Sequence, residues 1–192
     1  MINNIRKNRK SLKELFDAVI ATNAKGIVFA LDEALESSIN MIVEQAKAGG
    51  KSLLIGNGGS ASISSHIAID FWKNAGIKAS AFNDISLLTC ISNDYGYKHV
   101  FEKPIEMFAE PQDVLIAISS SGRSENILLA TKAAKAKGIK AITLSGFDEA
   151  NPLRKLGDIN FYVPSTSYGH VEITHLSIAH CLVDIIIENK NG

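Results

Sequence analysis

A turn rich in hydroxyl groups directly follows the apolar segment 113–118, and it reads Ser119-Ser120-Ser121-Gly122-Arg123-Ser124. Serine hydroxyls donate hydrogen bonds to anions, and a helix that begins after them adds free backbone N–H groups and the positive end of its dipole. A lone serine here would indicate only a helix N-cap. Four hydroxyls in six residues favour a phosphate site. The turn lacks a Walker-type lysine, so we expect it to bind a phosphate monoester without cleaving it.

A second turn follows the apolar segment 52–55 and is rich in glycine, with the sequence Gly56-Asn57-Gly58-Gly59-Ser60. Glycines allow the backbone to approach an anion closely, and the expected helix after the turn presents free N–H groups. The pattern is neither the GxGxxG dinucleotide fingerprint nor a P-loop. By itself it is equally typical of a tight strand-to-helix turn that binds nothing.

Short apolar segments alternate with helical stretches after residue 50. We expect strands at 52–55, 78–82, 113–118, 141–144 and 159–163, and helices at about 60–72, 124–137 and 171–188. Strands that are apolar on both faces indicate a parallel sheet covered by helices on each side. Ligands of such sheets bind outside the carboxyl ends of the strands, which is where both turns lie.

Two amphipathic helices, at about 4–20 and 25–48, are predicted to precede the first strand, because apolar residues recur there at helical spacing. The fold prediction is therefore α/β: a three-layer α/β/α sandwich with a five-stranded parallel sheet, preceded by two N-terminal helices. We expect a single domain over 1–192, with the helices in 1–50 and the α/β core in 51–192. The helices carry more apolar surface than one small sheet needs, so we assign 1–50 to oligomerisation.

The composition is that of a soluble globular protein, with 46% hydrophobic and 21% charged residues. The formal net charge is zero, which gives no indication of a nucleic-acid or membrane-surface partner. No apolar run approaches the roughly 18–20 residues of a membrane span, and no signal peptide is visible. The two cysteines, Cys90 and Cys181, form no CxxC pair and suit a reducing compartment. We therefore expect a cytoplasmic protein.

The two turns together make nearly the whole chain similar to the SIS (sugar isomerase) domain family, which has GNGGS after one strand and S-[ST]-S-G-x-S after a later one. Within that family the chain most resembles the phosphoheptose isomerases, where a histidine follows GNGGS by six positions, as His66 follows Ser60 here. Segment 91–97 also resembles that subfamily's Asn-Asp-aromatic-Gly stretch. The resemblance implies a homotetramer with its active site between subunits. It implies a sugar phosphate bound by Asn57, Gly58, Ser60, Asn93, Asp94, Ser119, Ser120, Ser121, Ser124 and Glu172.

Two histidines and two carboxylates occupy positions that match the family's metal and acid–base residues. His66 and Asp70 lie four residues apart on one predicted helix, and Glu172 and His180 lie eight apart on another. Two imidazoles and two carboxylates suit zinc or a similar divalent ion. The resemblance implies that His66, Asp70, Glu172 and His180 bind this metal, with Asp70 and His180 as the catalytic residues.

Four departures from the family pattern leave the substrate open. Asp70 stands where the family has Glu, Glu172 stands where it has Gln, and Ile63 and Gly169 stand where it has acidic residues. Aspartate is one methylene shorter than glutamate, about 1.5 Å of reach. A misplacement of about 1 Å lowers a rate by on the order of 100-fold.

Simpler interpretations of the same residues also exist. Asp70 is compatible with a surface position at a helix end, and His180 with a core histidine held by a hydrogen bond. His175 lies three residues after Glu172 and is an alternative metal ligand. His99 and His170 are expected to be ordinary surface or loop residues.

The favoured function is an isomerase that interconverts a ketose phosphate and an aldose phosphate, namely sedoheptulose 7-phosphate and a heptose 7-phosphate, for lipopolysaccharide or capsule synthesis. The reaction moves a proton between C1 and C2 through an enediol and needs a carboxylate and a histidine. One alternative is an isomerase of another sugar phosphate. The other is a non-catalytic regulatory protein, similar to SIS proteins that associate with the bacterial replication initiator and lack this pair. Asp70 and His180 favour the enzyme.

Overall fold

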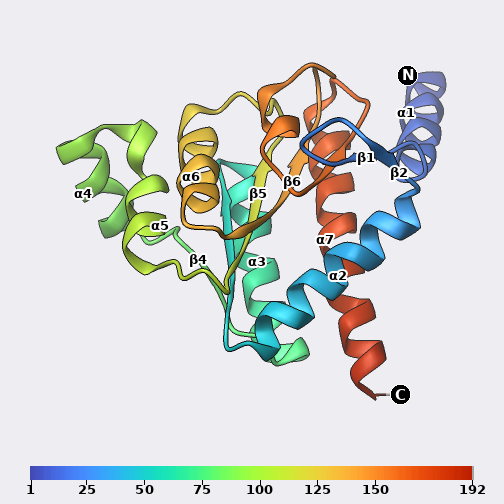
Figure 1. Ribbon diagram of the computed structural model, residues 1–192. Helices are drawn as coiled ribbons and strands as arrows, with labels where there is room; N and C mark the ends of the chain where they lie inside the picture. The colour runs from blue at the N-terminus through green and yellow to red at the C-terminus, as the bar shows by residue number, and fades with distance from the viewer. Residues whose placement is uncertain (192) are drawn as a thin grey trace.

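The computed structural model describes residues 1–191 and contains a mixed sheet of seven strands in the order β2-β1-β7-β6-β5-β3-β4 (Figure 1). Five of these strands are parallel, as the apolar segments predicted. They are β3 (Ser52–Gly56), β4 (Ala79–Ala81), β5 (Val114–Ser119), β6 (Lys140–Ser145) and β7 (Ile159–Tyr162). The central strands are buried on both faces, which explains their continuous apolar sequence.

Helices cover both faces of the sheet (Figure 1). One face packs against α2 (Leu31–Lys47), α3 (Gly59–Asp70) and α7 (Tyr168–Asn191). The other packs against α4 (Ile85–Tyr95), α5 (Glu102–Phe108) and α6 (Glu125–Ala136). Shorter turns complete the chain: the π-helical η1 (Phe71–Ala75) and the 3₁₀ turns η2 (Tyr97–His99) and η3 (Pro152–Lys155). Sequence analysis predicted no element for the region of α4 and α5.

The expectation of two uninterrupted N-terminal helices at 4–20 and 25–48 is wrong. The first helix, α1 (Ile2–Leu15), ends early, and a hairpin of β1 (Ile20–Thr22) and β2 (Val28–Phe29) separates it from α2. The Asn23 side chain accepts hydrogen bonds from the backbone N–H groups of Lys25 and Ile27, and Gly26 has a φ of +79°. These features form the hairpin turn. Because β1 pairs antiparallel with β7, the sheet has seven strands and is mixed, where five parallel strands were expected.

The strand order changes direction next to the two polar turns. The chain passes from β3 to β4 on one side and then returns to place β5 on the other side of β3. In sheets of this kind the crevice at such a switch point is the usual ligand site. Gly56 pairs with Ile118 in the β3–β5 register, so the glycine-rich and serine-rich turns start at the same level.

Helix α7 combines length with apolar character. Within residues 1–191 it is the one helix that by length and composition alone could cross a membrane. Its Val171, Ile178, Leu182 and Val183 side chains are buried against the sheet and its neighbours. Because these side chains pack in the core, the apolar sequence of α7 is that of a core helix.

Candidate active site

The serine-rich and glycine-rich turns meet at a small cavity of about 120 Å³. The residues that line it are Asn57, Ser60, Ile118, Ser119, Ser120, Ser121, Ser124, Tyr168 and Glu172. Ser60 and Ser119 are only 3% and 4% exposed, so their hydroxyls sit below the surface. The structure thus brings together the predicted serines from two different strand ends.

Two helices begin at this cavity. Helix α3 starts after Gly58, whose φ of +54° turns the chain sharply, and α6 starts after Ser124. The Ser119 hydroxyl donates to the Ser124 hydroxyl over 3.3 Å, and the backbone N–H of Arg123 donates to Ser121 Oγ over 3.2 Å. Because helix N-termini and hydroxyl groups face one cavity of this size, the site suits a phosphate group.

An amide pair joins the two turns. Asn57 and Asn126 exchange two hydrogen bonds of 2.9 Å each, and the Tyr97 hydroxyl donates to Asn57 Oδ1 over 2.8 Å. Asn126 Oδ1 also accepts the backbone N–H of Ile127 over 3.0 Å, and the residue is buried. Sequence analysis missed Asn126, Tyr97 and the cavity-lining Tyr168. The available signal for Asn126 was a polar residue at the start of a helix next to the serine-rich turn.

Glu172 belongs to this cavity in the structure. Its carboxylate lies against the backbone of Gly59 at the start of α3, where a Cβ would come within 2.5 Å of Oε1. A carboxylate at a helix N-terminus is favoured by the helix dipole. The position fits the predicted substrate-binding role of Glu172, but the structure does not place it with the other predicted metal ligands.

The remaining three predicted metal ligands, His66, Asp70 and His180, form a group. One ligand atom from each lies within 4.8 Å of the others. Asp70 Oδ2 is 3.4 Å from His66 Nε2 and 3.9 Å from His180 Nδ1, and Asn74 donates to Asp70 Oδ1 over 3.1 Å. The two imidazole rings meet edge to face at 5.2 Å. His66 and Asp70 lie on α3, and His180 lies on α7. The side chain of His180 is 37% exposed, so His180 is not a buried core histidine.

Other predicted residues lie elsewhere. Asn93 and Asp94 sit together on the exposed end of α4, where Asn93 donates to Asp94 over 2.9 Å, and neither lines the serine cavity. His175 is fully buried, and its Nε2 lies 3.1 Å from the backbone oxygen of Ser145, so it does not face the metal-ligand group. His99 pairs with Glu102.

Large apolar side chains are exposed on or next to the two helices that carry the His66–Asp70–His180 group. Ile69 and Trp72, which lie close to Asp70 along the chain, are 46% and 55% exposed, and Ile173 of α7 is 47% exposed.

Comparison with known proteins gives consistent results. A family model described as the SIS domain matches residues 11–146. A phosphoheptose isomerase of Helicobacter pylori is 39% identical over 162 residues, which cover 81% of this chain and 84% of that protein. A phosphoheptose isomerase of Clostridium acetobutylicum is 41% identical over 166 residues, covering 83% and 84%. The structure of phosphoheptose isomerase from Neisseria gonorrhoeae matches with a TM-score of 0.83 at 29% identity, covering 96% of this chain and 97% of that one.

Proposed function

Because the chain belongs to the SIS domain family and is similar throughout to phosphoheptose isomerases, we propose that it interconverts sedoheptulose 7-phosphate and a heptose 7-phosphate. The observation that carries this proposal is the pairing of a serine-lined cavity with a separate His66–Asp70–His180 group. The first suits the phosphate of the substrate. The second offers acid–base groups for the other end of the sugar.

The separation of the two parts fits a long sugar. Glu172 at the cavity and His180 in the second group lie on the same helix, eight residues apart, which corresponds to about 12 Å of helical rise. The extended carbon chain of a heptose phosphate spans about 9 Å from phosphorus to C1 with ordinary bond lengths. A substrate whose phosphate occupies the serine cavity therefore extends along α7 toward Asp70 and His180.

The isomerisation moves a proton between C1 and C2 through an enediol. We assign the proton transfer at the substrate carbons to Asp70. Its Oδ1 accepts a hydrogen bond from Asn74, and its Oδ2 faces both histidines. His180 turns Nδ1 toward Asp70, which leaves Nε2 to donate and accept the proton at the substrate oxygen. Glu172 holds sugar hydroxyls near the phosphate end.

The donor set also fits a divalent metal ion. Two imidazoles and one carboxylate oxygen within 4.8 Å of one another match the three protein ligands that a catalytic zinc ion would need. When bound, zinc polarises the substrate carbonyl and stabilises negative charge on its oxygen. Elemental analysis of protein purified without a His tag should find about one zinc per chain, and protein with His66→Gln should lose it.

We further propose that the chain acts as one SIS unit over residues 1–192 and assembles as a cytoplasmic homotetramer through residues 1–50 and the exposed apolar surface of Ile69 and Trp72. Burial of that surface by another copy would place a subunit boundary beside His66, Asp70 and His180. Light scattering at micromolar concentration tests the assembly, and a stable monomer contradicts it.

A panel of C5 to C7 ketose and aldose phosphates tests the function itself. We expect sedoheptulose 7-phosphate to give the highest kcat/KM, for use in lipopolysaccharide or capsule synthesis. Preference for a shorter sugar would assign the protein to another phosphate isomerase. Absence of turnover with every sugar, with phosphate binding intact, would favour the regulatory alternative.

A further inference from the structure

The segment that follows β6, residues 146–153, packs against the serine-rich turn without lining the serine cavity. The backbone N–H of Leu153 donates to the backbone oxygen of Gly122 over 3.2 Å. Gly146 lies so close to the turn that a Cβ there would come within 3.2 Å of the backbone oxygen of Ser120. Segment 146–153 therefore supports the turn from a side that the phosphate does not occupy.

Asn151 makes the closest contact between this segment and the turn. A Cβ at Gly122 would lie 2.0 Å from Asn151 Oδ1 and 2.3 Å from its Cγ. Gly122 has a φ of +60°, a left-handed conformation that glycine adopts readily and that bends the chain within the serine-rich turn. Asn151 is only 1% exposed, so it touches no ligand itself. Any effect that it has on phosphate binding must pass through Gly122.

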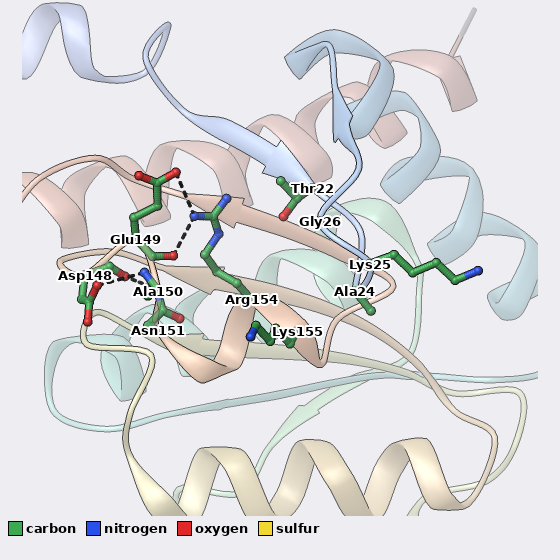
Figure 2. Close-up of a pocket in the computed structure, with 10 residues that line it drawn as sticks. All are labelled: Thr22, Ala24, Lys25, Gly26, Asp148, Glu149, Ala150, Asn151, Arg154 and Lys155. Carbon is green, nitrogen blue, oxygen red and sulfur yellow. Dashed lines mark hydrogen bonds and ion pairs between the residues drawn. The ribbon is translucent and has the colours of Figure 1, made fainter.

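The amide group of Asn151 is anchored within its own segment. Its Nδ2 donates to the backbone oxygen of Asp148 over 2.8 Å (Figure 2). The same nitrogen donates over 3.3 Å to the backbone oxygen of Gly146 and to the Ser145 hydroxyl. Ser145 ends β6 and pairs with Ser119 at the end of β5 in the strand register. One side chain therefore ties the segment to a strand end and presses its oxygen side against the turn.

We infer that Asn151 is a positioning residue for phosphate binding, because it holds Gly122 and with it the serine-rich turn in the conformation that binds the phosphate. The inference rests on the proposed function, in which the serine cavity binds the phosphate of the sugar. A turn that is held in place before the ligand arrives does not have to be ordered on binding. Fixing the backbone of one residue has a free-energy cost that corresponds to about tenfold in affinity.

Asn160 on β7 provides a matched control for this inference. It is 0% exposed, and its Nδ2 donates to the backbone oxygen and the hydroxyl of Thr143 over 3.1 and 2.8 Å. Like Asn151, it also donates to the Ser145 hydroxyl, over 3.4 Å, and within residues 1–191 its Oδ1 has no hydrogen-bond partner. The two asparagines differ at the turn, because the three atoms nearest to a Cβ at Gly122 all belong to Asn151.

Calorimetry with inorganic phosphate and steady-state kinetics of the full-length protein test the inference. Asn151→Ala should raise both the Kd for phosphate and the KM for the sugar phosphate by about tenfold, with kcat within about twofold of the wild type. Asn160→Ala should lower the melting temperature by a similar amount, because it also leaves buried acceptors unpaired, but it should leave Kd and KM unchanged. A purely structural role of Asn151 would make the two variants behave alike.

A milder variant, Asn151→Ser, keeps the test independent of folding defects. Its hydroxyl can donate one hydrogen bond within the segment, but it leaves the space against Gly122 empty. We expect the same loss of phosphate affinity as with alanine and a smaller fall in melting temperature. Unchanged phosphate affinity in Asn151→Ser, or an equal loss in Asn160→Ala, would overturn the inference. Phosphate binding without turnover of any sugar would instead contradict the proposed isomerase, and the phosphate measurements would still decide the role of Asn151.

Discussion

The Glu172 carboxylate occupies the space in front of Gly59, so closely that a Cβ at Gly59 would lie 2.5 Å from Oε1 and 2.7 Å from Oε2. This contact joins the start of α3 to the start of α7 across the serine cavity. Glu172 can occupy this position only because residue 59 has no side chain.

Replacing Gly59 with alanine should therefore change the site and leave the fold intact. The added methyl group displaces the flexible Glu172 side chain toward the cavity, and we expect KM for the sugar phosphate to rise by about tenfold, the worth of one charged hydrogen bond. Gly59 is helical, so alanine should not lower the melting temperature. Steady-state kinetics and thermal melting measure the two effects. Gly169→Ala, a helical glycine with open space around its Cβ position, is the matched control and should leave KM unchanged.

The serine hydroxyls provide a second prediction. Changing Ser119, Ser121 and Ser124 together to alanine removes three hydrogen bonds to a charged group, each worth about 1.5–3 kcal/mol. The KM or Kd for the sugar phosphate should rise at least about a hundredfold, with the circular dichroism spectrum preserved. Alanine at the exposed Ser11, Ser80 and Ser86 is the matched triple control. Unchanged affinity by calorimetry would show that the sugar phosphate binds elsewhere.

The α/β core was predictable because its strands are buried on both faces. Ile116 and Leu115 point to opposite sides of β5 and enter two separate clusters of the core, which makes the strand a continuous apolar run in the sequence. The hairpin was missed because Ile20 and Ile27 also fit the helical spacing of their apolar neighbours. Asn23 and Gly26 were the turn signal, and an argument from apolar spacing alone does not use it.

The candidate site was predictable in part. Hydroxyls at two strand ends converge because parallel strands end at one edge of the sheet, so Ser60 and Ser119 could be placed together from sequence. The Asn57–Asn126 pair could not, because residues 69 positions apart meet only through the tertiary packing of α3 and α6. The separation of Glu172 from His180 follows from helical rise, although both residues share one helix.

A third prediction concerns Asp70 and His180. His180→Gln and Asp70→Asn remove the proton-transfer groups and keep the size of each side chain, so turnover should fall by at least about a hundredfold. Binding of glycerol 2-phosphate should stay within about twofold, because the serine cavity is separate from this group. His99→Gln, which changes a histidine outside the group, should retain activity. A His180→Gln variant with full activity would remove the mechanism.

Buried His175 should make stability depend on pH. Burial lowers the pKa of its imidazole to about 4, although the hydrogen bond to the Ser145 backbone oxygen works in the opposite direction. Between pH 6.5 and about 4 the unfolded chain therefore carries a proton at this residue that the folded chain does not. Because the unfolded state binds more protons in this window, the free energy of unfolding falls as the pH falls.

Comparing the wild type with His175→Gln separates the contribution of His175 to the pH dependence of stability from that of the carboxylates. Lowering the pH from 7 to 4 should cost the wild type up to about 3 kcal/mol more than it costs His175→Gln, since each unit of pKa shift corresponds to about 1.4 kcal/mol. Urea unfolding at closely spaced pH values measures the difference. Parallel curves for the wild type and His175→Gln over this range would mean that His175 is protonated in the folded protein as readily as in the unfolded chain.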